Sequence, residues 1–328
     1  MAQILVFGES GADGDPVAIT AELLGAATRL NEAIGGDGVA CALIGAELEM
    51  AAQAAIAAGA STVYRAQHDA LAQYQTDSYL PVAAAIVEQV APAIVLFGQT
   101  SLGRDLAPRL ATRLGSAVAM DALALAAAGD RVQVTRSCYG GNARQVVTVE
   151  SDPQVVTVRA KSQDPLPEDT SRTGDIVAVD AAPGAARARV VGKETADTSG
   201  VRLEDATIVV SGGRGLGAPE AFADLERIAA DLGAAVGASR AACDLGWYPP
   251  SQQVGLTGTI VSPELYVAIA ISGASQHMAG CGGSKNIIAI NKDPDANIFR
   301  YCRFGIVDDY KKVLPQLELE LKQLVADR

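Results

Sequence analysis

The chain has 328 residues, about twice the roughly 150 that a single core commonly organises, and we therefore expect two domains. Hydrophobic residues make up 49% of the sequence, but the excess is alanine, and no run approaches the roughly 20 strongly apolar residues of a membrane-spanning helix. The net charge of -12 disfavours nucleic acid as a partner, because phosphate binding needs a clustered basic surface.

Metal sites and disulfide frameworks are not expected either. The five cysteines are scattered without a C-x-x-C pair, and the only histidines are His68 and His277, whereas zinc and iron–sulfur sites draw on closely spaced ligands. An odd number of widely spaced cysteines favours reduced thiols in a cytosol. No secretory or transit signal is visible at the start, so we expect a cytoplasmic protein.

Short apolar runs alternate with alanine-rich helical stretches up to about Leu114. The expected strands are residues 4–7, 39–44, 62–64 and 94–97, and the expected helices are residues 17–34, 50–58 and 78–90. This alternation predicts a nucleotide-binding-like parallel sheet with crossover helices. The Val- and Thr-rich runs that follow predict antiparallel additions to the same domain, at residues 131–135, 145–149 and 154–159.

A stretch rich in Pro, Gly and polar residues, 161–200, predicts a domain boundary near Thr195, giving domains at 1–195 and 196–328. The alternation then resumes. The expected strands are residues 206–210, 235–236, 266–271, 287–290 and 305–307, and the expected helices are residues 219–232 and 310–325. The sequence thus predicts two α/β domains, the second with a Rossmann-like parallel sheet.

The densest glycine cluster, Ser211 to Gly217, follows an expected strand and precedes an expected helix. Backbone N–H groups in such a turn can hold a pyrophosphate, and Arg214 adds a positive charge. The spacing G-x-G-x-G differs from the G-x-G-x-x-G of dinucleotide-binding turns. A tight strand–helix turn with a solvated arginine therefore remains the alternative.

Polar or small residues also follow other expected strands, at 238–240, 271–277 and 290–293, and a further polar segment, 252–258, lies in a connection. Ligands of open α/β sheets gather at the carboxyl ends of the strands, so these segments indicate one long ligand. His277 ends a strand and a glycine turn, where it can face an anionic group, although a lone histidine is more often structural. Trp247 to Pro250 fits ring stacking and a packed loop anchor equally well.

The sequence lacks the catalytic motifs of hydrolases and nucleoside triphosphatases. The sequence has no nucleophile elbow, no H-E-x-x-H motif and no lysine of a phosphate-binding loop after a glycine-rich turn. In the first half, residues 99–109 follow a strand and fit an anion-binding helix start, but a packed helix with a surface Arg/Asp pair explains them at least as well.

Seven segments occur in the order SGGRGLG, VGASRAA, QVGLTG, SPELY, ISGASQHMAG, AINKDPDANIF and FGIVDD. Together with TSLGRDLAPRLATRLG and GGNA (140–143) in the first half, they resemble the alpha subunit of electron transfer flavoproteins. The resemblance covers nearly the whole chain. It implies a heterodimer with a beta subunit, an FAD held mainly by the second domain, and a second nucleotide in the beta subunit, either AMP or a further FAD in electron-bifurcating members.

The resemblance also implies a set of FAD-binding residues. Arg214 corresponds to an arginine beside the pyrophosphate, Ser239 and Arg240 to a pair at the flavin ring, and His277 to a residue near the C2 carbonyl. The segment along the ring brings the Thr257 hydroxyl near flavin N5, and Leu256 stands where the family commonly has Gln. The full expected set is Arg214, Ser239, Arg240, Gln253, Val254, Gly255, Leu256, Thr257, Ser272, Gly273, Ala274, Ser275, Gln276, His277, Asn291, Asp309 and Tyr310. Asn291 and Asp309 correspond to contacts with the ADP half.

An electron carrier fits the absence of catalytic signatures. A positively charged Arg240, a positively charged His277 and a helix N-terminus would stabilise negative charge on a reduced flavin. The resemblance implies electron transfer from dehydrogenases, such as the acyl-CoA dehydrogenases of fatty acid beta-oxidation, to an acceptor such as a quinone oxidoreductase. An NAD-dependent enzyme with a similar domain and a flavin-free structural subunit remain the alternatives.

Overall fold

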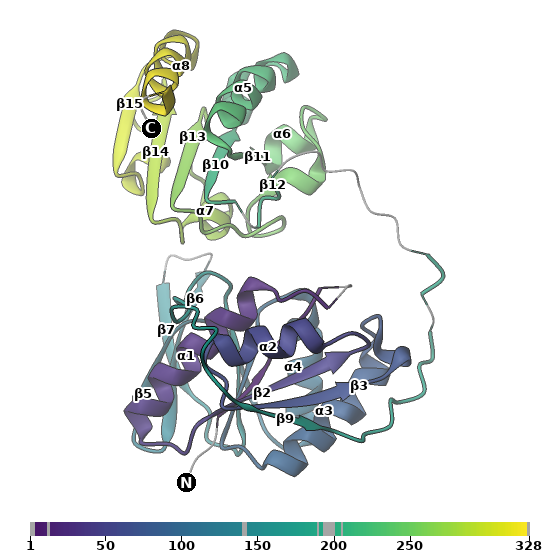
Figure 1. Cartoon of the computed structure of the whole chain (residues 1–328). Helices are drawn as coiled ribbons and strands as arrows, with labels where there is room; N and C mark the ends of the chain where they lie inside the picture. The colour runs from purple at the N-terminus through teal and green to yellow at the C-terminus, as the bar shows by residue number, and fades with distance from the viewer. Residues whose placement is uncertain are drawn as a thin grey trace. The chain divides into compact units, whose positions relative to one another are not determined.

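The structure, a computed structural model, describes residues 4–11, 14–139, 143–188, 190–192, 201–204 and 206–326. The expected domain boundary at Thr195 and residues 140–142 of the GGNA motif lie outside these ranges. Backbone contacts divide the chain into two compact units, the first comprising Met1–Ser137 and Arg144–Glu194 and the second comprising Cys138–Ala143 and Thr195–Arg328. Each unit has a sheet of its own (Figure 1). Each also has its own hydrophobic cores.

The first unit is built on a sheet whose described strands follow the order β7-β6-β5-β8-β4-β1-β2-β3-β9. These strands are β1 (Ile4–Phe7), β2 (Val39–Gly45), β3 (Thr62–Gln67), β4 (Ile94–Gly98), β5 (Val118–Ala128), β6 (Arg131–Cys138), β7 (Ala143–Thr148), β8 (Gln154–Val158) and β9 (Asp175–Ala178). Strands β1 to β4 pair in parallel, as the alternating pattern predicts.

Helices cover both faces of this sheet, because side chains of a strand alternate between its faces. In β1, Ile4 and Val6 pack with α1 (Ala18–Ile34) and α2 (Glu49–Ala57), whereas Leu5 and Phe7 pack on the other side. That side is covered by α3 (Thr76–Val90) and α4 (Ser101–Arg113). The first unit is therefore a three-layer α/β domain.

The expectation of antiparallel additions is right for one pair and wrong for β8. Strands β5 and β6 are antiparallel, with Leu125 opposite Val134. Strand β8 instead lies in the middle of the sheet and pairs in parallel with both β4 and β5. All five of its residues are buried, and its short Val-rich run lacks the polar alternation of a half-exposed strand, which is typical of parallel strands covered on both faces.

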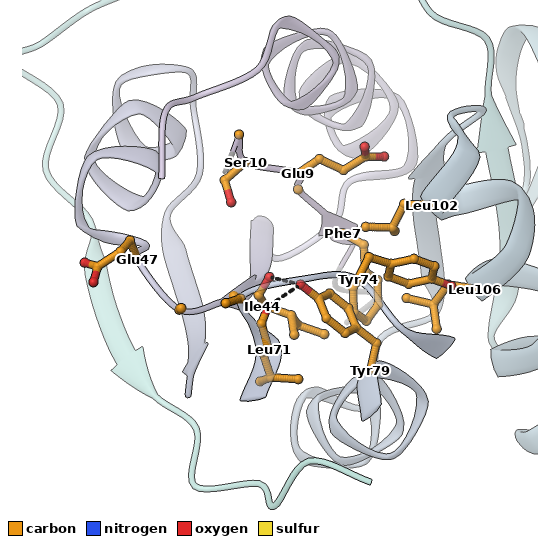
Figure 2. Close-up of a pocket in the computed structure, with 15 residues that line it drawn as sticks. Phe7, Glu9, Ser10, Ile44, Glu47, Leu71, Tyr74, Tyr79, Leu102 and Leu106 are labelled. Atoms are coloured by element: carbon orange, nitrogen blue, oxygen red, sulfur yellow. Dashed lines mark hydrogen bonds between the residues drawn. The ribbon is translucent and has the colours of Figure 1, made fainter. Parts of the chain in front are cut away.

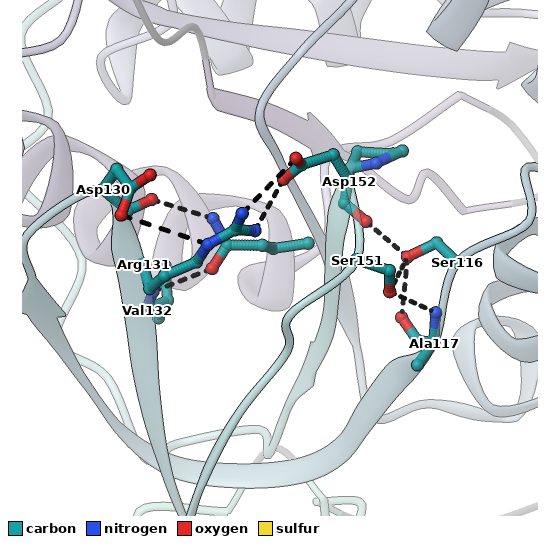
Figure 3. A network of polar contacts seen from close by, with 9 residues as sticks. Ser116, Ala117, Asp130, Arg131, Val132, Ser151 and Asp152 are labelled. Atoms are coloured by element: carbon teal, nitrogen blue, oxygen red, sulfur yellow. Dashed lines mark hydrogen bonds and ion pairs between the residues drawn. The ribbon is translucent and has the colours of Figure 1, made fainter.

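A polar network fixes β8 beside the β5–β6 hairpin (Figure 3). Arg131 forms an ion pair with Asp152 at 2.6 Å, and Ser151 accepts a hydrogen bond from the Ala117 backbone at 2.9 Å. Gln154 is 1% exposed. Its side chain accepts from the Val132 N–H at 2.8 Å and donates to the Asp130 carbonyl at 3.0 Å, so the hairpin turn is tied to the start of β8.

The described strands of the second unit are all parallel, in the order β12-β11-β10-β13-β14-β15. They are β10 (Ile208–Gly212), β11 (Ala235–Ser239), β12 (Gln253–Val254), β13 (Leu265–Ile269), β14 (Asn286–Asn291) and β15 (Phe304–Val307). Counted within the unit, this order is 3-2-1-4-5-6, that of dinucleotide-binding doubly wound sheets. The expected second α/β domain is confirmed, and β12 is an addition to the expected strands.

Helices α5 (Phe222–Leu232), α6 (Arg240–Asp244) and α8 (Tyr310–Ala326) pack against one face of this sheet, and α7 (Ser275–Cys281) packs against the other. In a 3-2-1-4-5-6 sheet the chain leaves β10 and β13 in opposite directions, which opens a crevice at the carboxyl ends of these two strands. The fold therefore places one defined site at this edge.

Candidate cofactor site

A pocket of about 440 Å³ lies at the carboxyl edge of the second sheet, where β10 and β13 end. Segments at the carboxyl ends of five strands, β10 to β14, contribute to its wall. The lining residues are Gly213, Arg214, Gly215, Ser239, Arg240, Ala241, Gln253, Gly255, Leu256, Thr257, Ala270, Ile271, Ser272, Ala274, Gln276, His277, Asn291, Asp293 and Ala296. The structure thus brings together most of the residues that the sequence predicts.

A second pocket of about 220 Å³ shares Gly215, Ala270 and Asn291 with the first and continues along the same edge. Asp309 and Tyr310 line this second pocket, as do two lysines, Lys292 and Lys311. The two pockets form an elongated site with the glycine-rich turn between them. Its shape suits a ligand with two ends and a charged middle.

The turn after β10 is shaped by two of its glycines. A Cβ atom on Gly213 would lie 2.2 Å from the Ala270 carbonyl oxygen, so a larger residue cannot approach the end of β13 this closely. Gly217 has φ +88°, a left-handed conformation that favours glycine. Between them Arg214 is exposed, and it has no ion-pair partner within the described part of the chain. Its guanidinium is available to an anion.

Ser239 and Arg240 stand where β11 passes into α6. The Ser239 hydroxyl accepts a 3.4 Å hydrogen bond from the Ala242 N–H and so caps the short helix. Arg240 is exposed, and its Nε lies 3.4 Å from the carboxylate of Asp244 one helical turn later. An exposed pair of this kind is weak, so the Arg240 charge at the pocket is only partly offset.

The segment 253–257 is pressed against α7. The Leu256 N–H donates a 2.8 Å hydrogen bond to the Gln276 carbonyl, and a Cβ on Gly280 would lie 2.4 Å from the Gly255 backbone. Gln253 donates a 3.0 Å hydrogen bond to the Thr257 hydroxyl. Leu256 is 54% exposed and lines the pocket, so its apolar side chain is available to cover a ring.

The expected positive charge on His277 is wrong. This residue begins the buried part of α7 and is only 7% exposed, and burial lowers the pKa of its imidazole to about 4. Its Nε2 lies 2.9 Å from the Tyr266 hydroxyl. A contact of the ring with the Val254 backbone raises the pKa slightly against this shift, and Nδ1 is itself buried. His277 therefore lines the pocket as a neutral imidazole.

Three expected residues do not line either pocket. Val254 is fully buried and packs in the core. Gly273 has φ +76°, and a Cβ there would lie 2.3 Å from the Ile298 backbone, so it serves the packing of a loop. Ser275 is the first residue of α7 and does not belong to the lining of either pocket. The pocket is also lined by residues outside the expected set, namely Gly213, Gly215, Ala241, Ala270, Ile271, Asp293 and Ala296. Gly213, Gly215, Ile271 and Asp293 fall in segments that the sequence singles out, whereas Ala241, Ala270 and Ala296 carry no such signal.

The corresponding edge of the first unit holds a smaller pocket, of about 120 Å³, shown in Figure 2. Aromatic and aliphatic side chains crowd it, among them Tyr74, Tyr79 and Leu106. The Tyr79 hydroxyl shares its one proton between the Leu71 carbonyl oxygen at 2.8 Å and the Ile44 carbonyl oxygen at 3.2 Å (Figure 2). No Lys or Arg belongs to the described wall, and Glu9 and Glu47 do, so this pocket is unsuited to a phosphate.

No helix within the described ranges combines the length and the apolar character needed to cross a membrane.

Most of the expected ligand-binding residues meet at the carboxyl edge of the second sheet. This edge favours a dinucleotide over a mononucleotide, because one pocket lies on each side of the glycine turn and its arginine. A dinucleotide has a ring system at each end and charged phosphates between them. The fold and the site agree on one class of ligand.

Comparisons with known proteins agree with this assignment. Residues 4–184 match the model of the electron transfer flavoprotein domain, and residues 202–282 match that of the electron transfer flavoprotein FAD-binding domain. The electron transfer flavoprotein subunit alpha of Bacillus subtilis is 42% identical over 326 residues, covering 98% of each chain. That of Thermoanaerobacterium thermosaccharolyticum is 38% identical over 327 residues, with the same coverage, and that of Syntrophomonas wolfei is 39% identical over 325 residues, covering 98% of this chain and all of its own. The chain belongs to the family of electron transfer flavoprotein alpha subunits, whose second domain binds FAD.

Proposed function

We propose that this chain holds its FAD in the two connected pockets at the carboxyl edge of the second sheet. The observation that carries the proposal is the meeting of these pockets at the glycine turn, where β10 and β13 end in a 3-2-1-4-5-6 sheet. The exposed Arg214 and the glycine turn suit the phosphates of such a cofactor. The residues present therefore fit the group.

The parts of FAD would be held by different segments. The backbone N–H groups of the turn and Arg214 would hold the pyrophosphate, and Asn291, Asp309 and Tyr310 would lie at the ADP half. The flavin ring would lie against the larger pocket. Its expected contacts are Ser239, Arg240, Gln253, Gly255, Leu256, Thr257, Ser272, Ala274, Gln276 and His277.

Bound FAD supplies a ring that accepts and releases electrons. Arg240 would place a positive charge near the ring and so stabilise negative charge there. The carboxylate of Asp244, 3.4 Å from Arg240, would partly offset that positive charge. Leu256 would cover apolar surface of the ring, and neutral His277 adds no net charge to the pocket wall. No group in this site has to act as an acid or base on a metabolite, which fits an electron carrier.

We further propose that the chain works with a beta subunit and passes electrons one at a time from dehydrogenases, such as acyl-CoA dehydrogenases, to an acceptor such as a quinone oxidoreductase. The relatives are named as alpha subunits, which supports a beta partner. The cysteines in the described part of the chain are free, which supports a reducing compartment such as the cytoplasm. Flavin content per heterodimer will decide whether the beta subunit carries AMP or a second, bifurcating FAD.

Replacement of Arg214 by Ala tests the site. A charge-assisted hydrogen bond contributes about 1.5 to 3 kcal/mol, so FAD should bind about ten- to a hundredfold more weakly to the heterodimer. Arg227→Ala is the matched control, because Arg227 is an exposed arginine of α5 that pairs with Asp224 and lies outside both pockets. Equal FAD affinity in the two variants would contradict the proposed site, and nicotinamide binding without a flavin spectrum would favour the NAD-dependent alternative.

A further inference from the structure

Two exposed lysines line the second pocket, and neither forms an ion pair within the described part of the chain. Lys292 follows β14 directly, and Lys311 lies in the first turn of α8. By contrast, Lys285, Lys312 and Lys322 of the same unit each form an ion pair with a carboxylate. The two lysines that lack such a pair are thus the two that line a pocket, which favours an anionic ligand there.

The side chains around Lys311 leave its charge available. Its neighbour Lys312 pairs with Asp308 at 3.0 Å and lines neither pocket. The Asp309 carboxylate accepts a 3.0 Å hydrogen bond from the backbone N–H of Lys311 and forms no ion pair with its ammonium group. The ammonium group instead lies 6.0 Å from the centroid of the Tyr310 ring, which also lines the second pocket. Such a contact holds the group near the pocket without neutralising it.

The place of Lys311 in its helix is unfavourable without an anion. The N-terminus of a helix carries a partial positive charge, so a lysine in the first turn is repelled there. In Lys312 this repulsion is offset by the carboxylate of Asp308, whereas no ion pair within the described ranges offsets it in Lys311. A bound phosphate would offset it.

The positive side chains are divided between the two pockets. Arg214 and Arg240 line the larger pocket together with one carboxylate, Asp293, and the two lysines line the second pocket together with one carboxylate, Asp309. With the flavin ring in the larger pocket, the phosphate on the flavin side meets Arg214 at the glycine turn. The phosphate on the adenosine side then lies toward the two lysines.

We propose that Lys292 and Lys311 make the site selective for FAD over FMN, because they bind the adenosine-side phosphate of FAD. FMN has the flavin ring and one phosphate, which occupy the larger pocket and the glycine turn, but it has no second phosphate to reach the lysines. The inference rests on the proposed function, because it takes the flavin end to lie in the larger pocket. Selection then depends on charge in the second pocket, whereas contacts to the ring serve FAD and FMN alike.

Equilibrium dialysis of FAD and of FMN against the FAD-free heterodimer tests this selection. Each lysine should contribute about two- to fivefold to FAD affinity, since contacts of exposed charges are weak, so Lys292→Gln with Lys311→Gln should weaken FAD binding about four- to twentyfold. FMN affinity should change less than twofold. Lys311→Arg keeps the charge and should retain most of the FAD affinity that Lys311→Gln loses. Equal losses for FAD and FMN, or an equal loss in Lys311→Arg and Lys311→Gln, overturn the inference.

Lys312→Gln is the matched control, because it removes a neighbouring lysine that is paired and lies outside both pockets. It should leave the affinities for FAD and FMN unchanged. Added salt should weaken FAD binding more in the unsubstituted heterodimer than in the double lysine variant, because salt screens the charges that the variant lacks. An equal salt dependence in the two proteins overturns the inference.

Comparison with Arg214→Ala separates the inference from the proposed function. If Arg214→Ala weakens FAD binding but the double lysine variant behaves like Lys312→Gln, the FAD site stands and the selective role of the lysines falls. If neither Arg214→Ala nor the double lysine variant alters FAD binding, the assignment of the site falls and the inference falls with it.

Discussion

The Tyr310 hydroxyl donates a 2.7 Å hydrogen bond to the carbonyl oxygen of Leu216, across 94 residues of sequence. Tyr310 is the first residue of α8, and Leu216 is the buried centre of the glycine turn after β10. Both residues are almost fully buried, at 7% and 2% exposure, so water competes little for this bond. The last helix thereby fixes the turn that we assign to the FAD pyrophosphate.

Tyr310→Phe should loosen this turn while leaving the ring packed in its core. We expect FAD to bind about two- to tenfold more weakly, because one neutral hydrogen bond is lost. Hydrogen exchange of the amides from Gly213 to Gly217 should become faster in the FAD-free protein. Unchanged exchange together with unchanged FAD affinity would show that the bond to Leu216 does not order the turn.

Arg240 and Asp244 should shift the reduction potential of the bound FAD in opposite directions. Arg240→Ala removes a positive charge beside the ring and should lower the potential, whereas Asp244→Asn removes the carboxylate 3.4 Å from Arg240 and should raise it. Both shifts should be some tens of millivolts, because about 59 mV corresponds to a tenfold change for one electron and the pair is exposed. Spectroelectrochemical titration measures them. Shifts of the same sign would remove this pair from the proposed role.

The expected set of site residues shows what a sequence can predict. The turn at Gly213–Gly217 is recognisable because glycine spacing after a strand reflects local backbone needs, and strand ends such as Ser239 and Asn291 reach the same edge by topology alone. The protonation of His277 is different. It depends on burial beneath the pocket wall and on contact with Tyr266, which lies 11 residues away in sequence, and neither can be read from residue types.

In the fold, too, local sequence pattern predicts some features, whereas others depend on long-range contacts. Alternating strands and helices predict both α/β units, but β8 was expected as an antiparallel addition and lies in the middle of the first sheet. Local pattern specifies that Gln154–Val158 is extended, whereas its neighbours are chosen by long-range pairing and by the contacts of Gln154 with the β5–β6 hairpin. The two-residue strand β12 is too short to give any periodic signal.

Gln154→Leu should destabilise the first unit. The substitution keeps a buried side chain of similar size but leaves the Val132 N–H and the Asp130 carbonyl without partners, at a cost of about 1 to 3 kcal/mol. Hydrogen exchange at Val132 in the complete chain should become about ten times faster or more. Gln53→Leu, on an exposed position of α2, is the control and should have almost no effect. Equal exchange in the two variants would contradict the role of Gln154.

The buried imidazole makes stability depend on pH with a definite sign. Burial lowers the pKa of His277 from 6.5 to about 4, so the unfolded chain binds a proton more readily and acid favours unfolding. Between pH 7 and pH 5 this residue should account for about 2 kcal/mol of lost stability in the FAD-free protein. His277→Asn should lose less stability over the same interval, as measured by urea unfolding of both proteins at each pH. An identical pH dependence in the two would mean that His277 is not buried as a neutral group.

The flavin content of the purified heterodimer shows whether the second sheet binds FAD. We expect the triple substitution Ser239→Ala, Thr257→Val and His277→Phe to remove one FAD per heterodimer. The corresponding triple substitution in the first-unit pocket, Ser10→Ala, Tyr74→Phe and Tyr79→Phe, should leave the visible flavin spectrum unchanged. A heterodimer that keeps its full flavin content after the first set of substitutions would contradict the assignment of FAD to the second sheet.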